Sequence, residues 1–220
     1  MFHDDQHGTA IVTVAAVLNS LKLVKKDIKK VKIVVLGAGA AGYGITNLLV
    51  YAGAKNIIVL DSHGAIFKGR KNINKYKDRI ANITNSNNIK GNLETVINGS
   101  DVFIGVSGHN NILTAKMIKS MNEDPIIFAL SNPDPEINPY KAKKAGAKII
   151  ATGRSDFKNQ VNNDLVFPFF VRKILDNKIK KISDNTMYQM AKKIASVNKK
   201  LSDNHIISNI DEIKSYYSNK

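Results

Sequence analysis

The 220-residue sequence contains no cysteine and no tryptophan. Without cysteine it has no disulfide, no thiolate ligand for a metal and no cysteine nucleophile. No apolar run approaches the roughly 20 residues that span a bilayer, and the first residues lack the basic-then-apolar pattern of a secretion signal. We therefore expect a cytoplasmic protein that has no membrane partner.

Acidic residues are scarce, since 18 Asp and Glu stand against 33 Lys and Arg and give a formal net charge of +15. Such an excess is compatible with nucleic-acid binding. The lysines are spread along the whole chain, however, from Lys25 and Lys26 to Lys199 and Lys200, and they do not alternate with exposed aromatic residues. This distribution favours lysines scattered over solvated faces, and we expect no nucleic-acid partner.

A β-branched apolar run over residues 31–36 leads directly into a glycine-rich turn and then into a helical pattern. In such a strand–turn–helix, Gly37 allows the sharp turn, Gly39 lets the backbone approach a pyrophosphate, and Gly42 allows close packing of helix and strand. The helix N-terminus presents its N–H groups to the phosphates. A glycine-rich turn of another α/β protein stays an alternative. The predicted cofactor-binding segment is Gly37, Ala38, Gly39, Ala40, Ala41 and Gly42.

Asp61 ends the apolar run 57–60, about twenty residues after the glycine turn, where dinucleotide-binding folds place the carboxylate that binds the adenosine ribose. A carboxylate accepts hydrogen bonds from both ribose hydroxyls and repels a 2′-phosphate. We therefore predict NAD as the cofactor. NADP stays an alternative, because Lys68 and Arg70 could reach a phosphate.

Further unbroken apolar runs alternate with helical patterns, which is typical of a parallel sheet covered on both faces. We predict an α/β, doubly wound, mostly parallel sheet of five or six strands with a Rossmann-type dinucleotide-binding fold. No internal repeat or long linker divides the sequence, so residues 1–200 are predicted as one NAD(P)-binding domain and 201–220 as a polar, loosely held tail. The predicted strands are 31–36, 57–60, 101–107, 125–130 and 148–152.

The first residues have an unusual density of polar side chains: Asp4 and Asp5 are adjacent, and His3 and His7 flank them. Carboxylates and imidazoles in this arrangement could bind a hard divalent cation. The same residues would equally suit a polar chain end or the N-cap of the helix expected over residues 10–24. Apolar positions surround that helix almost completely, so we expect it to be buried on most sides.

Several separate stretches of the sequence are more specific than the glycine turn. They include FHDDQHGTA (2–10), FALSNP (128–133), TGRSD (152–156) and NQVNN (159–163). Together with the glycine turn they resemble the malic enzyme family, specifically its NAD-binding domain, and the resemblance extends to about residue 200. It implies the oxidative decarboxylation of L-malate to pyruvate and CO2, with NAD or NADP and with Mg2+ or Mn2+.

The resemblance also implies roles for individual residues. Asp5 would be one metal ligand, and Asp4 would belong to the catalytic hydrogen-bond network around the base. Asn132 would lie near the nicotinamide ribose and malate, and Asn163, or its neighbour Asn162, would bind the malate carboxylate. Amides suit such contacts because they donate hydrogen bonds without adding charge. From the residues alone, Asn132 before a proline would also fit an Asx turn.

Enzymes of that family also carry an N-terminal domain with a catalytic lysine base, a tyrosine acid and a Glu-Asp pair that completes the metal site. This sequence has no counterpart of that domain, so we expect the chain to be inactive alone. It would associate with such a domain or form a homo-oligomer, because the apolar first helix would otherwise expose its surface. The alternative, from a different functional class, is a stand-alone module that binds NAD and catalyses nothing.

Overall fold

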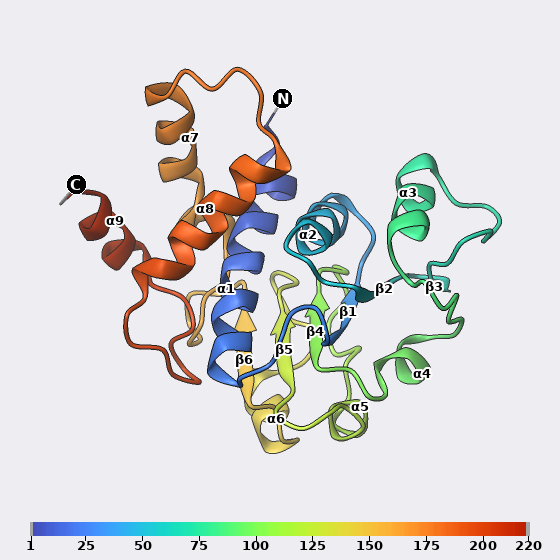
Figure 1. The fold of residues 1–220 in the computed structure, drawn as a ribbon. Helices are drawn as coiled ribbons and strands as arrows, with labels where there is room; N and C mark the ends of the chain where they lie inside the picture. Colours follow the sequence, from blue (N-terminus) through green and yellow to red (C-terminus); the bar gives the residue numbers. More distant parts are fainter. Residues whose placement is uncertain (1, 219–220) are drawn as a thin grey trace.

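The computed structural model describes residues 2–218, which form a six-stranded sheet with helices on both faces (Figure 1). The strand order is β3-β2-β1-β4-β5-β6, and all neighbours run parallel except β3, which pairs antiparallel with β2. The α/β, doubly wound, mostly parallel Rossmann-type fold is confirmed. The strands are β1 (Lys32–Leu36), β2 (Asn56–Asp61), β3 (Gly64–Ala65), β4 (Val102–Gly105), β5 (Ile126–Ala129) and β6 (Ile149–Thr152).

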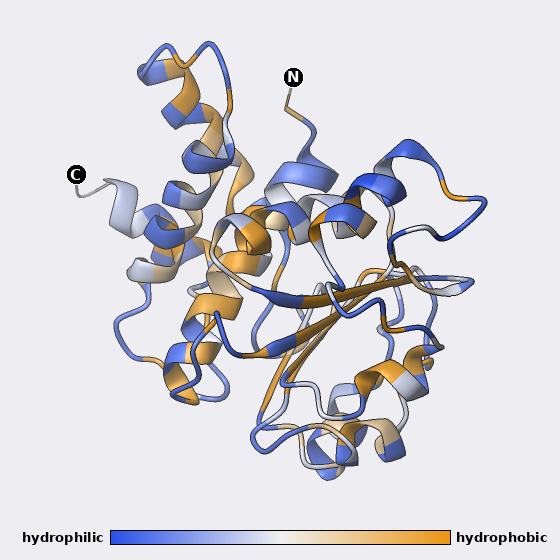
Figure 2. Ribbon diagram, turned by 45° about the vertical axis from the view of Figure 1, so that its right-hand side comes forward, coloured by the Kyte–Doolittle hydropathy of each residue, from blue (hydrophilic) through white to orange (hydrophobic). Residues whose placement is uncertain are grey.

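Two helical layers form because successive side chains of a strand point to opposite faces of the sheet. Ile33 and Val35 of β1 pack in the core beneath α1–α3 and α7–α9, whereas Val34 and Leu36 pack on α4–α6. Figure 2 shows the apolar sheet between helices with polar outer sides. The helices are α1 (Thr9–Leu23), α2 (Ala40–Tyr51), α3 (Lys75–Ile83), α4 (Leu93–Ile97), α5 (Ala115–Lys119), α6 (Pro139–Lys144), α7 (Phe167–Asp176), α8 (Asp184–Val197) and α9 (Ile210–Ser218), with short turns η1 (Asp4–Gly8) and η2 (Asn163–Leu165).

Helix α1 is buried on most sides, as expected, but within this chain itself. Helices α2 and α8 pack against it, and side chains such as Met190 and Ile194 of α8 join the same core. The expectation that α1 would expose an apolar surface is therefore wrong. The exposed large apolar side chains lie elsewhere and include two on α7, Phe167 at 41% and Leu175 at 67% exposure. No helix within residues 2–218 is long and apolar enough to cross a membrane.

The expectation of a loosely held chain after residue 200 is wrong for the residues that the structure describes. Ile206, Ile207 and Ile213 are buried in the main core. Two asparagine amides fix this segment: Asn19 Nδ2 donates to the Ile206 carbonyl (2.8 Å), and Asn159 Oδ1 accepts from the Ile206 N–H (2.9 Å). A few isolated isoleucines and distant amides therefore order a stretch that is mostly polar. The domain boundary at residue 200 stays a prediction.

The parallel arrangement places the carboxyl ends of β1, β4, β5 and β6 at one edge of the sheet. In open α/β sheets this edge is where ligands bind. The segments that follow the strands, together with η1 and the start of α1, surround the cavities described below.

Candidate dinucleotide and substrate site

The turn between β1 and α2 requires glycine at its two ends. Gly37 has a φ of +113°, and a Cβ there would lie 2.4 Å from the Val106 carbonyl oxygen. A Cβ on Gly42 would lie only 1.8 Å from the Gly37 oxygen, so the first turn of α2 packs directly on the loop. Gly39, by contrast, has nothing within 4 Å of the position that a Cβ would take, which leaves one open side of the turn. That open side is where a pyrophosphate could approach the backbone.

Helix α2 begins at this open side. Gly39 is its N-cap residue in an extended conformation, and no side chain caps the helix. The first N–H groups of a helix have no partner within the helix and lie at the positive end of its dipole. The N-terminus of α2 therefore has both the donors and the field that an anionic group needs, and the cofactor-binding role of residues 37–42 stays a prediction.

A cavity of about 760 Å³ runs from the glycine turn past Asp61. Its lining includes Gly37, Ala38 and Gly39 of the turn and the apolar residues Ile112 and Met117. This combination of backbone N–H groups, a carboxylate and apolar side chains matches the phosphate, ribose and base of an adenosine diphosphate moiety. Ile112 and Met117 were not predicted as site residues, because they follow no motif and come from separate segments.

Asp61 lies at the end of β2, with its side chain only 6% exposed. It forms ion pairs with Arg70 Nη2 (2.8 Å) and Lys77 Nζ (2.7 Å), and its Oδ1 accepts a hydrogen bond from the His63 N–H (2.9 Å). Burial alone would raise the pKa of Asp61, but the hydrogen bonds from Lys77 and Arg70 outweigh it, so this pKa lies below its ordinary value. The carboxylate is therefore ionised and already held in place. The sequence offered Arg70 as a possible cation here but not Lys77.

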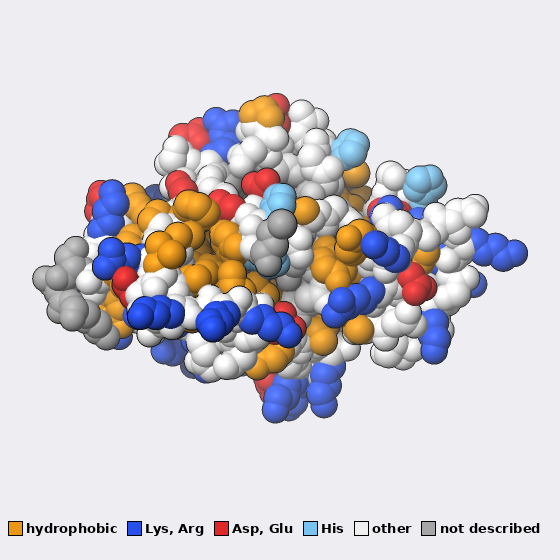
Figure 3. Space-filling model, turned by 90° about the horizontal axis from the view of Figure 1, so that it is seen from above, with side chains coloured by type: hydrophobic (Ala, Val, Ile, Leu, Met, Phe, Trp, Pro, Cys, Tyr) orange, Lys and Arg blue, Asp and Glu red, His pale blue; other side chains and the backbone are white. Residues whose placement is uncertain are grey.

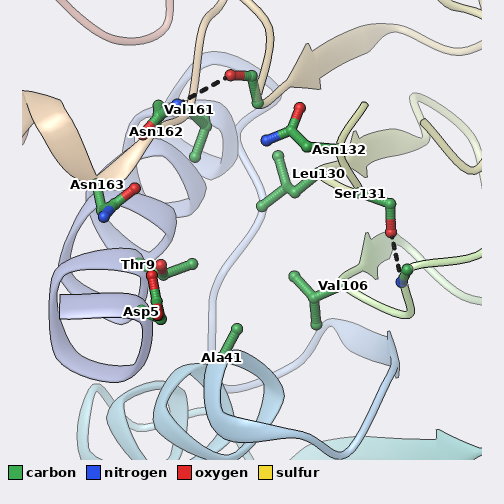
Figure 4. A pocket seen from close by; sticks show the side chains of 12 residues that line it. Asp5, Thr9, Ala41, Val106, Leu130, Ser131, Asn132, Val161, Asn162 and Asn163 are labelled. Carbon is green, nitrogen blue, oxygen red and sulfur yellow. Dashed lines mark hydrogen bonds between the residues drawn. The ribbon is translucent and has the colours of Figure 1, made fainter. Parts of the chain in front are cut away.

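A second cavity of about 280 Å³ opens at the carboxyl ends of β4, β5 and β6 (Figure 4). Asp5 and Thr9 lie beside each other on one side of it, and Asn132 lies across from them. Val106 lines both cavities, so the two adjoin, and we refer to them together as the groove. Among the described lining residues of this second cavity, Asp5 is the only one with an ionisable side chain.

Asp4 does not line that cavity but supports its wall. Its Oδ2 accepts a hydrogen bond from Asn163 Nδ2, and its Oδ1 is buried without a partner among the described residues. Gly8 makes room for this carboxylate, since a Cβ on Gly8 would lie 2.0 Å from Asp4 Oδ1. Burial raises the pKa of Asp4 above its ordinary value, although the hydrogen bond from Asn163 opposes the shift.

The three predicted asparagines have different environments. Asn132 makes no hydrogen bond within residues 2–218 and lies against Gly153, where a Cβ would be 2.7 Å from its Nδ2, so the structure contains no Asx turn at this residue. The Asn162 side chain is engaged with the backbone, because Nδ2 donates to the Gly153 carbonyl (3.2 Å) and Oδ1 accepts from the Asp164 N–H (3.2 Å). The Asn163 amide reaches the cavity with its orientation set by the bond to Asp4.

The donor set does not fit a complete divalent metal site. No group of three or more histidine, aspartate, glutamate or cysteine side chains within residues 2–218 could hold a metal ion. His7 Nδ1 instead accepts a hydrogen bond from the His3 N–H (2.9 Å), and burial lowers the pKa of His7. Asp5 contributes a single carboxylate, whereas Mg2+ prefers several oxygen ligands. The cation site considered for the first residues is not assembled by these side chains alone.

The comparisons with known proteins match this architecture. A family model described as "Malic enzyme, NAD binding domain" matches residues 6–219. The chain belongs to the malic enzyme family. It is 50% identical over 198 residues to the bifunctional malic/malolactic enzyme of Bacillus subtilis, a match that covers 90% of this chain and 48% of that protein. It is 49% identical over 180 residues to the NADP-dependent malic enzyme of Escherichia coli, covering 80% of this chain and 23% of that protein.

Solved malic enzymes share the fold. The NAD-dependent malic enzyme of Thermotoga maritima superposes with a TM-score of 0.93 at 44% identity, over 98% of this chain and 57% of that one. The chain thus corresponds to the NAD-binding domain of the malic enzyme family and spans about half the length or less of the curated relatives cited above. The individual roles of Asp4, Asp5, Asp61 and the asparagines stay predictions at this point.

Proposed function

We propose that this chain is the NAD-binding part of a malate dehydrogenase (decarboxylating), which converts L-malate and NAD to pyruvate, CO2 and NADH. The observation that carries the proposal is the single groove in which a dinucleotide-type glycine turn and Asp61 lie next to a cavity with Asp5, Asn132 and Asn163. Its membership in the malic enzyme family supports the same reaction. The whole reaction is proposed for an assembly that contains this domain.

The residues of the groove would act mainly by binding and orientation. The N-terminus of α2 would hold the pyrophosphate and Asp61 the adenosine ribose. When bound, NAD supplies the acceptor for the hydride that leaves C2 of malate. Asn132 has an amide at the cavity wall without a partner among the described residues, and it would donate to the nicotinamide ribose or to malate. Asn163 would bind the malate carboxylate, and Asp4 would fix that amide within the proton network around the base.

We propose NAD as the preferred cofactor and NADP as the weaker one. The ionised Asp61 suits two ribose hydroxyls and opposes a 2′-phosphate. Arg70 is also bound to the carbonyls of Gly64 and Ala65 (3.2 Å each), so its guanidinium is committed, whereas Lys77 lines the cavity and could turn to a phosphate. Dissociation constants for NADH and NADPH, measured side by side, test this choice. Tighter binding of NADPH would contradict it.

Turnover would require chemical groups beyond those of the described residues. The cavity that would receive malate has no lysine or tyrosine among its described lining residues, and one carboxylate is too few for Mg2+ or Mn2+. Asp5 would therefore be one ligand of a metal ion whose other ligands belong to a second polypeptide. A second polypeptide, an N-terminal malic enzyme domain or another copy of this chain, would supply them.

An apolar surface supports the proposal that such a partner exists. Phe167 and Leu175 of α7 are exposed, and the ring of Phe2, which is partly buried, lies with its centroid 6.0 Å from that of Phe167. Figure 3 shows apolar side chains gathered on this face of the molecule, between α7 and the first residues. Large exposed apolar patches commonly mark interaction sites. Sedimentation velocity, with and without a supplied N-terminal malic enzyme domain, would show whether this face is used.

The direct test of the function is NADH formation from malate and NAD in the presence of Mn2+. We expect no turnover by the chain alone and measurable turnover after addition of the N-terminal half of a malic enzyme that carries the lysine and tyrosine. A rate typical of the family from this chain by itself would contradict the need for a partner. If neither preparation turns over malate although the chain binds NADH tightly, the second candidate is favoured, a stand-alone NAD-binding module. That candidate also fits the observation that only one of the described residues lining the smaller cavity, Asp5, has an ionisable side chain.

A further inference from the structure

Glu136 is a fully buried carboxylate that the proposed reaction does not use. It lies between the carboxyl ends of β4 and β5, so close that a Cβ on Gly105 would be 2.3 Å from its Cδ. No cation pairs with it within residues 2–218. A carboxyl group buried in this way is tolerated only where hydrogen-bond partners replace the lost water.

Two serines supply those donors. Ser131 donates its hydroxyl to Glu136 Oε1 (2.5 Å) and its N–H to Oε2 (3.2 Å). Ser107 donates both its N–H and its hydroxyl to Oε1, each at 3.2 Å. The carboxylate therefore joins the segment after β4 to the segment after β5 by four hydrogen bonds.

The hydrogen bonds around Glu136 extend to residues that line both cavities. Ser131 Oγ accepts a hydrogen bond from the Gly108 N–H (2.9 Å), and Gly108, Ser131 and the adjoining Asn132 line the cavity with Asp5. Ser107 lines the cavity with Asp61. The position of the Asn132 backbone thus depends on a carboxylate that does not itself reach the cavity.

We propose that Glu136 is a positioning residue, which holds the segment Ser131–Asn132 and Gly108 in place for the nicotinamide half of the cofactor. The proposal rests on the proposed NAD-binding function. It predicts that binding of the nicotinamide half of the dinucleotide depends on Glu136, whereas binding of the adenosine half does not. In a Glu136→Gln variant the amide oxygen can keep the three donors at Oε1, but the amide NH2 then faces the Ser131 N–H, and two donors cannot pair. The Ser131 segment must move, while the Ser107 side keeps its bonds.

The test compares binding of NADH with binding of AMP, which occupies only the adenosine end. We expect E136Q to weaken NADH binding about tenfold or more, since leaving a buried group unpaired is costly. AMP binding should change by less than about twofold, the size of a typical remote effect. Calorimetric titration of the full wild-type and variant chains gives, for NADH and for AMP, the ratio of the variant to the wild-type dissociation constant.

Asp101→Asn is the matched control. Asp101 is also a buried carboxylate, but it directly precedes β4 at the opposite end of that strand, where it accepts from Lys26 Nζ (2.9 Å) and the Lys32 N–H (2.8 Å). D101N should lower thermal stability and leave the NADH-to-AMP affinity ratio unchanged. If E136Q does not fold, S131A removes the hydroxyl that links Glu136 to Gly108 and should still weaken NADH selectively, by about fivefold.

The outcomes separate the inference from the function on which it rests. An E136Q variant with the wild-type ratio, or with equal losses for NADH and AMP, would show a purely structural role and overturn the inference. A selective loss of NADH affinity supports it. A wild-type chain that binds neither ligand would instead refute the proposed NAD-binding function, and the role of Glu136 would fall with it.

Discussion

The two ends of the groove differ in how much of a site they contain. At the adenosine end, the glycine turn, the N-terminus of α2 and an ionised Asp61 with two cationic partners are all present. At the other end, the described lining residues supply three asparagine amides, the hydroxyls of Thr9 and Ser131, and one carboxylate, Asp5. At the first end Asp61 already has its partners, whereas at the second end the Asn132 amide, and Asp4 Oδ1 behind the cavity wall, have none among residues 2–218.

This difference indicates which part of the function the fold itself supplies. The adenosine end depends on how a parallel sheet and its first turn pack, so it forms whenever the domain folds. The reacting end depends on side chains that must converge from several segments, and those described here do not include a base or a full set of metal ligands. We therefore expect cofactor binding to survive separation from a partner and turnover to be lost.

The largest expected effect concerns the glycines. Gly42→Ala should lower the free energy of unfolding by about 2 kcal/mol or more, because its Cβ would overlap the Gly37 carbonyl, and NADH binding should be lost with the turn. Gly39→Ala should cost less, about 1 kcal/mol or below, because its Cβ meets open space and only the poorer N-cap preference of alanine counts against it, yet it should obstruct the pyrophosphate. Urea unfolding and NADH titration of both variants measure this contrast, and equal destabilisation would contradict it.

Removal of the carboxylate at the ribose position should have the next largest effect. Asp61→Asn should weaken NADH binding about tenfold, since one charged hydrogen-bond acceptor is lost, while NADPH binding should weaken less or improve. Lys77→Ala is the matched variant, because it removes a cation from the same cluster and should weaken NADPH more than NADH. If both variants lower the affinities for NADH and NADPH in equal proportion, that result would argue against a ribose contact by Asp61.

The same cluster predicts a pH dependence of stability. The folded-state pKa of Asp61 is depressed, so its contribution is fully present above the ordinary pKa of 3.8 and is lost as the pH falls through the lower folded-state value. The difference in free energy of unfolding between the wild type and D61N should therefore be largest near pH 7 and shrink progressively in acid below about pH 4. Urea titrations at a series of pH values test this, and a difference that grows in acid would show the sign to be wrong.

The smallest effect is expected at the incomplete end. Asp5→Asn should leave the NADH affinity of the isolated chain within about twofold, since a single exposed side chain contributes little by itself. It should also leave Mn2+ binding to the isolated chain as weak as in the wild type. A large loss of Mn2+ affinity in D5N would mean that the chain holds the metal without a partner.

The sequence patterns predicted the part of the candidate site that is formed by residues close together in the chain. The glycine turn and Asp61 lie on one strand–turn–helix–strand unit, so their spacing along the sequence determines their positions in space. The apolar runs likewise identified five strands, but the two-residue β3 was not among the predicted strands, because Gly64 and Ala65 form too short a stretch for any periodicity.

Long-range contacts were missed for the opposite reason. No sequence pattern connects Asp61 with Lys77, sixteen positions apart, or Glu136 with Ser107, and both contacts form only when separate segments of the chain meet in the fold. The cover of α1 by α8 and the burial of Ile206 are of the same kind. Even within one motif the sequence does not predict the contacts of each residue. The adjacent Asn162 and Asn163 have different partners, the Gly153 carbonyl and the Asp4 carboxylate, which their identical residue types do not distinguish.

The central claim is that the chain by itself contains a complete binding site for the dinucleotide. Titration of the isolated wild-type chain with NADH, followed by calorimetry, tests it most directly. We predict one saturable site per chain, with AMP competing for it. Absence of saturable NADH binding by a folded chain would contradict the claim.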